Sequence, residues 1–162
     1  MNSLKLNTNK ICEVRLGKKG AEKQFSPVLE DIGYKRVNAR LHDFENPSTG
    51  RRIELKKQAD QQWLDPSKFH HMTDKEANTT IMFVMADKKD KSLIESIYAI
   101  KTIDFINLLC NDEACYEAGW SWETINLLGR LKKTHHPKLQ PKAEVKMRKL
   151  LSKYPNEFSH LY

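Results

Sequence analysis

Two spacings of hydrophobic residues occur along the chain, and each predicts a different kind of element. Between Ala21 and Tyr34, apolar residues recur every three or four positions, which predicts a helix that Gly33 would end. Pro27 lies inside this pattern, so we expect the helix to begin late or to kink there. A second helix is expected from Thr102, where the apolar residues of the run TIDFINLL share one face.

Shorter apolar runs predict the strands of a sheet. We expect strands at 37–41 and 51–57, separated by the turn-forming residues 46–50, and a hairpin with strands at 80–86 and 93–101. This order of elements is typical of a mixed α/β (α+β) domain, in which helices flank one central mixed β-sheet.

The remaining segments have less regular patterns. Residues 58–78 are polar and lack a clear period, so we expect a long irregular stretch or a short helix. Helices are expected at 123–132 and at 141–154, the second with Pro141 at its first position. Residues 135–141 are expected to be extended, because each proline there biases its predecessor away from the helix.

The composition is that of a soluble globular protein. Hydrophobic residues make up 39% and charged residues 30%, the mean hydropathy is −0.69, and the length suits a single domain, 1–162. No apolar run is long enough to span a bilayer, and the first ten residues lack the apolar core of a secretory signal. Cys12, Cys110 and Cys115 lack metal-finger spacing, which is typical of reduced thiols and predicts a cytoplasmic protein.

Positive charge is concentrated near the C-terminus. The chain has 28 Lys and Arg against 21 Asp and Glu, a formal net charge of +7. Residues 130–153, predicted as a basic C-terminal helical segment, contain nine basic residues and one acid, so they carry +8 and the rest carries −1. Such a block beside a nearly neutral body is expected of a protein that binds a polyanion; the alternative is a Lys-rich solvated helix.

The best candidate for chemistry is an acid followed, after ten intervening residues, by Glu-x-Lys on a predicted strand. The strand period places Glu54 and Lys56 on one face and Leu55 on the core face. The turn at 46–50 would fold Asp43 back towards Glu54, so that two carboxylates converge as ligands for Mg²⁺. Lys56 would then orient or help deprotonate the attacking water. The alternative is a solvated strand face with an incidental ion pair.

This constellation has a counterpart in a known family. The run Glu54-Leu55-Lys56, followed some fourteen residues later by Phe69-His70-His71-Met72, resembles the PvuII-type restriction endonucleases of the PD-(D/E)xK nuclease superfamily. The resemblance extends over about two thirds of the chain, from Asp43 to Met147. The family's motif begins with a proline, where this chain has His42.

The resemblance implies a restriction-endonuclease-like fold and a type II restriction endonuclease acting on a short palindrome in double-stranded DNA. Asp43 and Glu54 would bind the metal with the Leu55 carbonyl, and Lys56 would be the catalytic lysine. The cofactor would be Mg²⁺, with Mn²⁺ as a substitute. The enzyme would act as a homodimer, and a cognate DNA methyltransferase would be its genetic rather than physical partner.

The same resemblance and the basic segment together predict residues that contact DNA. These are His70 and His71, near the bases or the scissile region, and Lys132, Lys133, His136, Lys138 and Lys142, along the backbone.

Two other functions remain open: a structure-specific endonuclease of the same superfamily, for junction resolution or repair, and a non-catalytic DNA-binding module. A further acid could assist the metal site, either Glu45 or a residue of the first helix. Of the two candidates in that helix, we expect Glu30 to be better placed than Glu22. The rival pair Asp87 and Lys89 is better explained as the polar cap of a hairpin turn.

Overall fold

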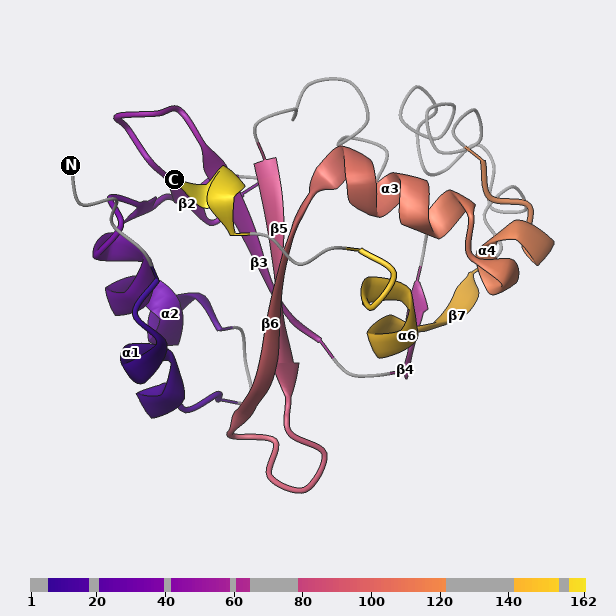
Figure 1. Ribbon diagram of the computed structural model, residues 1–162, viewed down its shortest axis with the longest axis horizontal. Coiled ribbons are helices and arrows are strands. Elements are labelled where there is room, and N and C mark those ends of the chain that lie inside the picture. Colours follow the sequence, from indigo (N-terminus) through magenta and orange to yellow (C-terminus); the bar gives the residue numbers. More distant parts are fainter. Residues whose placement is uncertain are drawn as a thin grey trace. The chain divides into compact units, whose positions relative to one another are not determined.

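The computed structural model describes residues 6–17, 21–39, 42–58, 61–64, 79–121, 142–154 and 158–162 (Figure 1). The chain forms two compact units. Unit 1 comprises Met1–Ala59, Asn78–Ile100 and Asn156–Tyr162, and unit 2 comprises Asp60–Ala77 and Lys101–Pro155. The mixed α/β fold class is confirmed, since a five-stranded mixed sheet with one parallel pair is accompanied by helices.

The main sheet has the strand order β1-β2-β3-β5-β6. The first three strands pair antiparallel, whereas β3 and β5 pair parallel. The strands expected at 51–57, 80–86 and 93–101 are therefore confirmed. The bounds are β1 (Lys35–Arg36), β2 (Phe44–Glu45), β3 (Arg52–Gln58), β5 (Thr79–Ala86) and β6 (Ile94–Lys101).

The strand expected at 37–41 is wrong for residues 37–39, and residues 40 and 41 lie outside the described residues. Pairing occurs on either side of this segment, in β1 and β2. The Val37 N–H donates to the Asp43 carbonyl (2.9 Å), which closes the connection between the two strands. Strands of two residues are too short to show the alternation on which the prediction depended.

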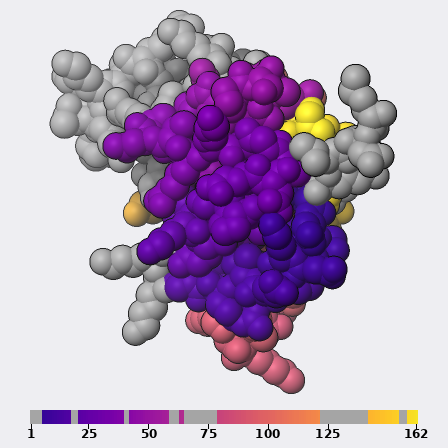
Figure 2. Space-filling model, turned by 90° about the vertical axis from the view of Figure 1, so that its left-hand side faces the viewer, coloured from indigo at the N-terminus to yellow at the C-terminus, as the bar shows by residue number. Residues whose placement is uncertain are grey.

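Among the described residues, two α-helices belong to unit 1: α1 (Thr8–Glu13) and α2 (Glu22–Glu30). The second confirms the predicted helix, and its start at Glu22 leaves Pro27 inside the helix rather than at its beginning. As expected, Gly33 follows the helix with a positive φ of 95°, a conformation that glycine adopts without strain. Figure 2 shows both helices (indigo) on the outside of the unit, with the turn between β5 and β6 (pink) protruding below them.

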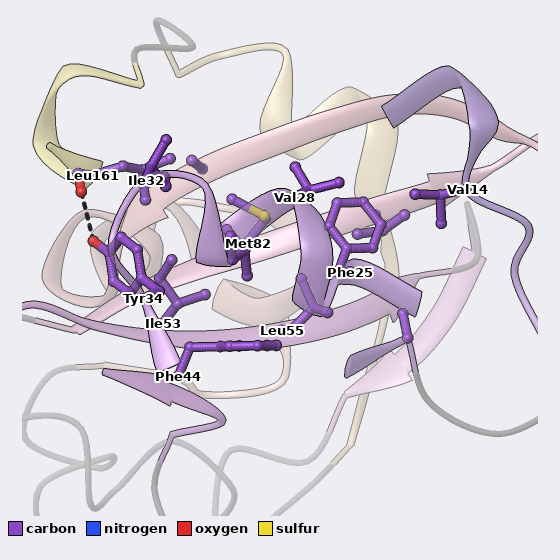
Figure 3. Close-up of a cluster of buried hydrophobic side chains, with 14 of the residues drawn as sticks. Val14, Phe25, Val28, Ile32, Tyr34, Phe44, Ile53, Leu55, Met82 and Leu161 are labelled. Atoms are coloured by element: carbon purple, nitrogen blue, oxygen red, sulfur yellow. Dashed lines mark hydrogen bonds between the residues drawn. The ribbon is translucent and has the colours of Figure 1, made fainter. Parts of the chain in front are cut away.

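The core of unit 1 lies between α2 and one face of the sheet (Figure 3). Phe25 and Val28 of the helix meet Ile53 and Leu55 of β3 and Met82 of β5, and all five side chains are at most 4% exposed. Burial of this apolar surface holds β3 in register, because a slip by one residue would turn Leu55 outwards.

A buried hydrogen bond ties the C-terminus to this core. The Tyr34 hydroxyl donates to the carbonyl of Leu161 in the short helix η4 (Ser159–Leu161) at 2.6 Å (Figure 3). Burial raises the pKa of Tyr34 to about 12, so the hydroxyl remains a donor throughout the neutral range.

We therefore expect Tyr34→Phe to lower the free energy of unfolding by about 1–3 kcal/mol, because the Leu161 carbonyl loses its donor in a buried position. Urea unfolding followed by circular dichroism measures this difference. Tyr116→Phe is the matched control, since Tyr116 is 75% exposed. Equal losses in the two variants would show that the bond adds nothing.

Unit 2 contains a two-stranded antiparallel sheet and three described helices. The first of these helices confirms the one expected from Thr102. Cys115 and Trp120 are buried here, as packing residues are. The elements are β4 (Gln61–Leu64), β7 (Ala143–Lys146), α3 (Thr102–Cys110), α4 (Glu113–Glu117) and α6 (Met147–Leu151). None of the described helices is both long and apolar enough to cross a membrane.

The helix expected at 141–154 is wrong over 143–146, which form β7, and within the basic segment a described helix begins only at Met147. In β7, Ala143 and Val145 are buried while Glu144 and Lys146 are exposed, which is the alternation of a strand. The pattern was ambiguous without β4, its partner, which lies in the segment expected to be irregular or helical. The predictions for 123–132 and 135–141 fall outside the described residues.

Candidate active site

The turn after β2 brings Asp43 back beside β3, as predicted. Asn46 organises this turn: its N–H donates to the Arg51 carbonyl, and its carbonyl accepts from Gly50, both at 2.8 Å. Gly50 has a φ of 72°, which favours glycine at this position. One step beyond the paired residues of β2, the Asp43 N–H donates to the Ile53 carbonyl at 2.8 Å.

The Asp43 carboxylate is held by the backbone of β3. Its Oδ2 accepts a hydrogen bond from the Leu55 N–H at 2.7 Å, in the place where a longer β2 would have continued the ladder. Because the N–H and C=O of one strand residue point to the same edge, the Leu55 carbonyl faces the same side as Asp43. The backbone oxygen and the carboxylate that the sequence predicted as metal ligands thus share one edge of β3.

Glu54 and Lys56 lie together on the face of β3 opposite the core, as their spacing predicted. Lys56 Nζ donates to Glu54 Oε1 at 3.0 Å, and the side chains are 38% and 19% exposed, respectively. The parallel register places Ile81 of β5 beside Glu54 and Phe83 beside Lys56, and both apolar residues are at most 1% exposed. Water therefore reaches Glu54 from few directions.

Burial makes both carboxylates more basic than usual. It raises the pKa of Asp43 above its ordinary value, against the Leu55 hydrogen bond and the Lys56 charge, which lower it. Burial likewise raises the pKa of Glu54, against the charge and hydrogen bond of Lys56, and the negative charge of Asp43 adds to the increase. A single lysine thus compensates two crowded carboxylates only in part.

Such a pair suits a divalent cation. Mg²⁺ binds to hard oxygen donors and commonly uses one or two carboxylates, with water and phosphate oxygens at its other positions. Within the described residues, no group of three or more His, Cys, Asp or Glu side chains is arranged to hold a metal ion. The Asp43 and Glu54 carboxylates and the Leu55 carbonyl are nevertheless the kinds of oxygen donor that Mg²⁺ takes together with several waters.

Glu22, in the first turn of α2, is an acid that the sequence analysis did not favour. Its negative charge raises the pKa of both Asp43 and Glu54. Glu30, which was expected to be better placed, is exposed at the other end of the same helix. The sequence contains both acids but does not show which end of the helix lies nearer the site.

Glu45 forms contacts of its own, on β2. Its Oε2 lies 3.3 Å from His42 Nε2 and 4.0 Å from Arg52 Nε. His42, the residue before Asp43, is 8% exposed. Asp87, the rival acid, accepts hydrogen bonds from the N–H groups of Lys89 and Asp90 in the turn after β5, as a turn cap does.

Most of the predicted DNA contacts lie outside the described residues. Lys142 is described, and it is exposed immediately before β7. The others, which the structure does not place, are His70, His71, Lys132, Lys133, His136 and Lys138.

No protein-family model, curated protein or solved structure matches this chain. The candidate site is thus characterised by its own geometry and charge.

The raised pKa values predict how stability depends on pH. At about pH 3 and below, Asp43 and Glu54 are largely protonated in both the folded and unfolded states. As the pH rises, the unfolded carboxylates ionise first, so the free energy of unfolding falls until the folded carboxylates have also ionised. In chelator, Asp43→Asn/Glu54→Gln should therefore melt above the unsubstituted protein at pH 7 and at the same temperature at pH 3.

Thermal unfolding across this pH range, repeated with Mg²⁺, measures the effect. Added Mg²⁺ should raise the melting temperature of the unsubstituted protein and leave that of the double variant unchanged. A double variant that is less stable at pH 7 would contradict the proposed crowding of the two carboxylates.

Proposed function

We propose that this protein is a Mg²⁺-dependent DNA endonuclease of the PD-(D/E)xK type, acting as a type II restriction endonuclease on double-stranded DNA. One observation carries the proposal: two half-buried carboxylates lie beside and on β3, the charge of Asp43 raises the pKa of Glu54, and a lysine contacts Glu54. The resemblance at Glu54–Lys56 supports the nuclease class, and the basic segment supports a polyanionic substrate.

In this mechanism Asp43 and Glu54 would hold the cation, together with the Leu55 carbonyl. The chemistry supplied by Mg²⁺, or by Mn²⁺ as a substitute, would be that of a Lewis acid at the phosphate and at the attacking water. The Leu55 N–H fixes one oxygen of Asp43 and so orients that carboxylate. Lys56 moves from its contact with Glu54 to orient the attacking water and to stabilise negative charge on the phosphate.

Cleavage of both strands at a palindrome requires two active sites related by the two-fold axis of the duplex, so the proposed enzyme is a homodimer. In-line attack of water on the phosphodiester would leave a 5′-phosphate and a 3′-hydroxyl. A restriction enzyme also requires a DNA methyltransferase to protect the host genome. That methyltransferase would be a genetic partner and need not bind this chain.

Incubation with several unmethylated plasmids in Mg²⁺, with an EDTA control, tests the proposed function. Discrete fragments that disappear with EDTA would support a sequence-specific nuclease, and sequencing their ends would give the site. Cleavage confined to branched DNA would favour the structure-specific alternative. Tight binding without loss of strands would favour a non-catalytic module and overturn the proposal.

A further inference from the structure

We propose that the outer edge of β6 is a homodimer interface, at which the same strand of a second copy pairs antiparallel. Among the described strands, β6 is at one end of the sheet and has a neighbour, β5, on one side only. It is eight residues long and contains no proline. Long regular edges of this kind are usually covered, because their backbone groups invite another strand.

The direction of the backbone groups shows which residues face this edge. The Leu93 carbonyl accepts from the Asp87 N–H at 2.9 Å, so Leu93 faces β5. The period of two then turns the backbone groups of Ile94, Ser96 and Tyr98 away from β5. Just before the strand, the Ser92 carbonyl accepts from the Leu16 N–H at 2.7 Å, so the chain itself covers the edge up to that point.

An open apolar groove begins where this cover ends. It has a volume of about 820 Å³, and its lining includes the four consecutive residues Ile94–Ile97 of β6. Apolar side chains from the N-terminal segment and the C-terminus also line it. These are Leu6, Ile11, Phe158 and Tyr162. An apolar groove lined by four consecutive residues of an edge strand suits an added strand.

The charges on β6 favour a second copy of this chain as the occupant. If two β6 strands pair about a two-fold axis at Tyr98, Glu95 of each copy lies opposite Lys101 of the other. Both residues are exposed in the single chain. The register also makes Tyr98 a hydrogen-bonded pair with itself, in agreement with the outward direction of its backbone groups. Two opposite-charge pairs flank one centre, as a self-complementary interface requires.

The interface would also place the two candidate active sites as the proposed function requires, and this part of the inference rests on that function. The two-fold axis of an antiparallel pair is normal to the sheet, so Glu54 of both copies would face the same side. Five strand spacings separate β3 of one copy from β3 of the other, in the order β3-β5-β6 and back. At about 4.8 Å each, the two sites would lie about 24 Å apart, facing one duplex.

Sedimentation of the full chain at micromolar concentration tests the interface without any DNA. We expect a dimer of twice 18.9 kDa. Lys101→Glu should raise the dissociation constant of the dimer at least tenfold. The double variant Glu95→Lys/Lys101→Glu should bring the constant back close to that of the unsubstituted protein. Lys91→Glu is the matched control, because Lys91 is exposed in the turn before β6 and changes the charge equally. Ser96→Pro should give a monomer, since it removes an outward N–H and leaves the pairing with β5 intact.

Cys12 provides an independent probe, because it lines the groove and is exposed. Its alkylation by a maleimide, followed by peptide mass spectrometry, should slow as the concentration rises through the range in which the dimer forms. A chain that stays monomeric, or a dimer that resists both Ser96→Pro and Lys101→Glu, would overturn the interface. Either result leaves the cation site at Asp43 and Glu54 to be tested separately, so the failure of one proposal is distinguishable from that of the other.

Discussion

Glu54→Gln is expected to lower the rate of DNA cleavage by roughly 10³-fold. The substitution keeps the shape of the side chain and removes one of the two carboxylates that hold the cation. Because burial of the charged carboxylate opposes folding, the variant should fold at least as stably as the unsubstituted protein in chelator. Single-turnover cleavage of supercoiled plasmid in Mg²⁺ measures the rate.

Glu45→Gln is the control for this variant. Glu45 is an acid on the neighbouring strand, and its contacts are with His42 and Arg52 rather than with the candidate site. The Glu45→Gln variant should cleave DNA within about threefold of the rate of the unsubstituted protein, which is a small difference beside the loss of a catalytic group. A Glu54→Gln variant that cleaves as fast as this control would remove Glu54 from the catalytic site.

Lys56→Met is expected to lower cleavage by roughly 10²- to 10³-fold while leaving cation binding intact or stronger. The substitution removes the charge that orients water and stabilises the phosphate, and it also removes a positive charge beside the cation. The effect on cation binding distinguishes the role of Lys56 from that of Glu54, because replacement of Glu54 should reduce both cleavage and cation binding. Cleavage rates and Mn²⁺ titrations of the same preparations measure the two effects.

Lys57→Met provides the comparison on the same strand. Lys57 donates to the Gly17 carbonyl at 3.0 Å, so its ammonium group is occupied elsewhere in unit 1. The Lys57→Met variant should therefore cleave DNA at close to the rate of the unsubstituted protein. If Lys56→Met cleaves as well as Lys57→Met, Lys56 is only the partner of a surface carboxylate.

The longer elements of unit 1, α2, β3, β5 and β6, could be predicted because each carries enough residues to show its period, whereas the six-residue helix α1 was not predicted. β5 and β6 have eight residues each, and the burial in β3 alternates around Leu55. β1 and β2 have two residues each and are defined by pairing rather than by any local pattern. The strand expected at 37–41 is wrong for this reason.

In the candidate site, too, the features set by local sequence could be predicted and those set by tertiary contacts could not. The strand period predicted that Glu54 and Lys56 share a face, and the turn chemistry of 46–50 predicted that Asp43 returns towards them. The hydrogen bond from Leu55 to Asp43 and the influence of Glu22 depend on how β2 ends and how α2 packs. Those are tertiary features, and no spacing in the sequence expresses them.

The pairing of β4 with β7 shows the same limit in unit 2. The run Ala143–Lys146 fits either a helix turn or a short strand, and it becomes a strand because β4 supplies its hydrogen-bonding partner. That partner lies about eighty residues earlier in a polar segment. A contact over such a separation leaves no local signal.

The proposed function depends above all on Asp43 and Glu54 forming one site for a divalent cation. Isothermal titration calorimetry with Mn²⁺, on the unsubstituted protein and on Asp43→Asn/Glu54→Gln, tests it most directly and needs no substrate. We expect the unsubstituted protein to bind at least one Mn²⁺ that the double variant, shown to be folded by circular dichroism, does not bind. Equal stoichiometry and affinity in the two proteins would contradict it.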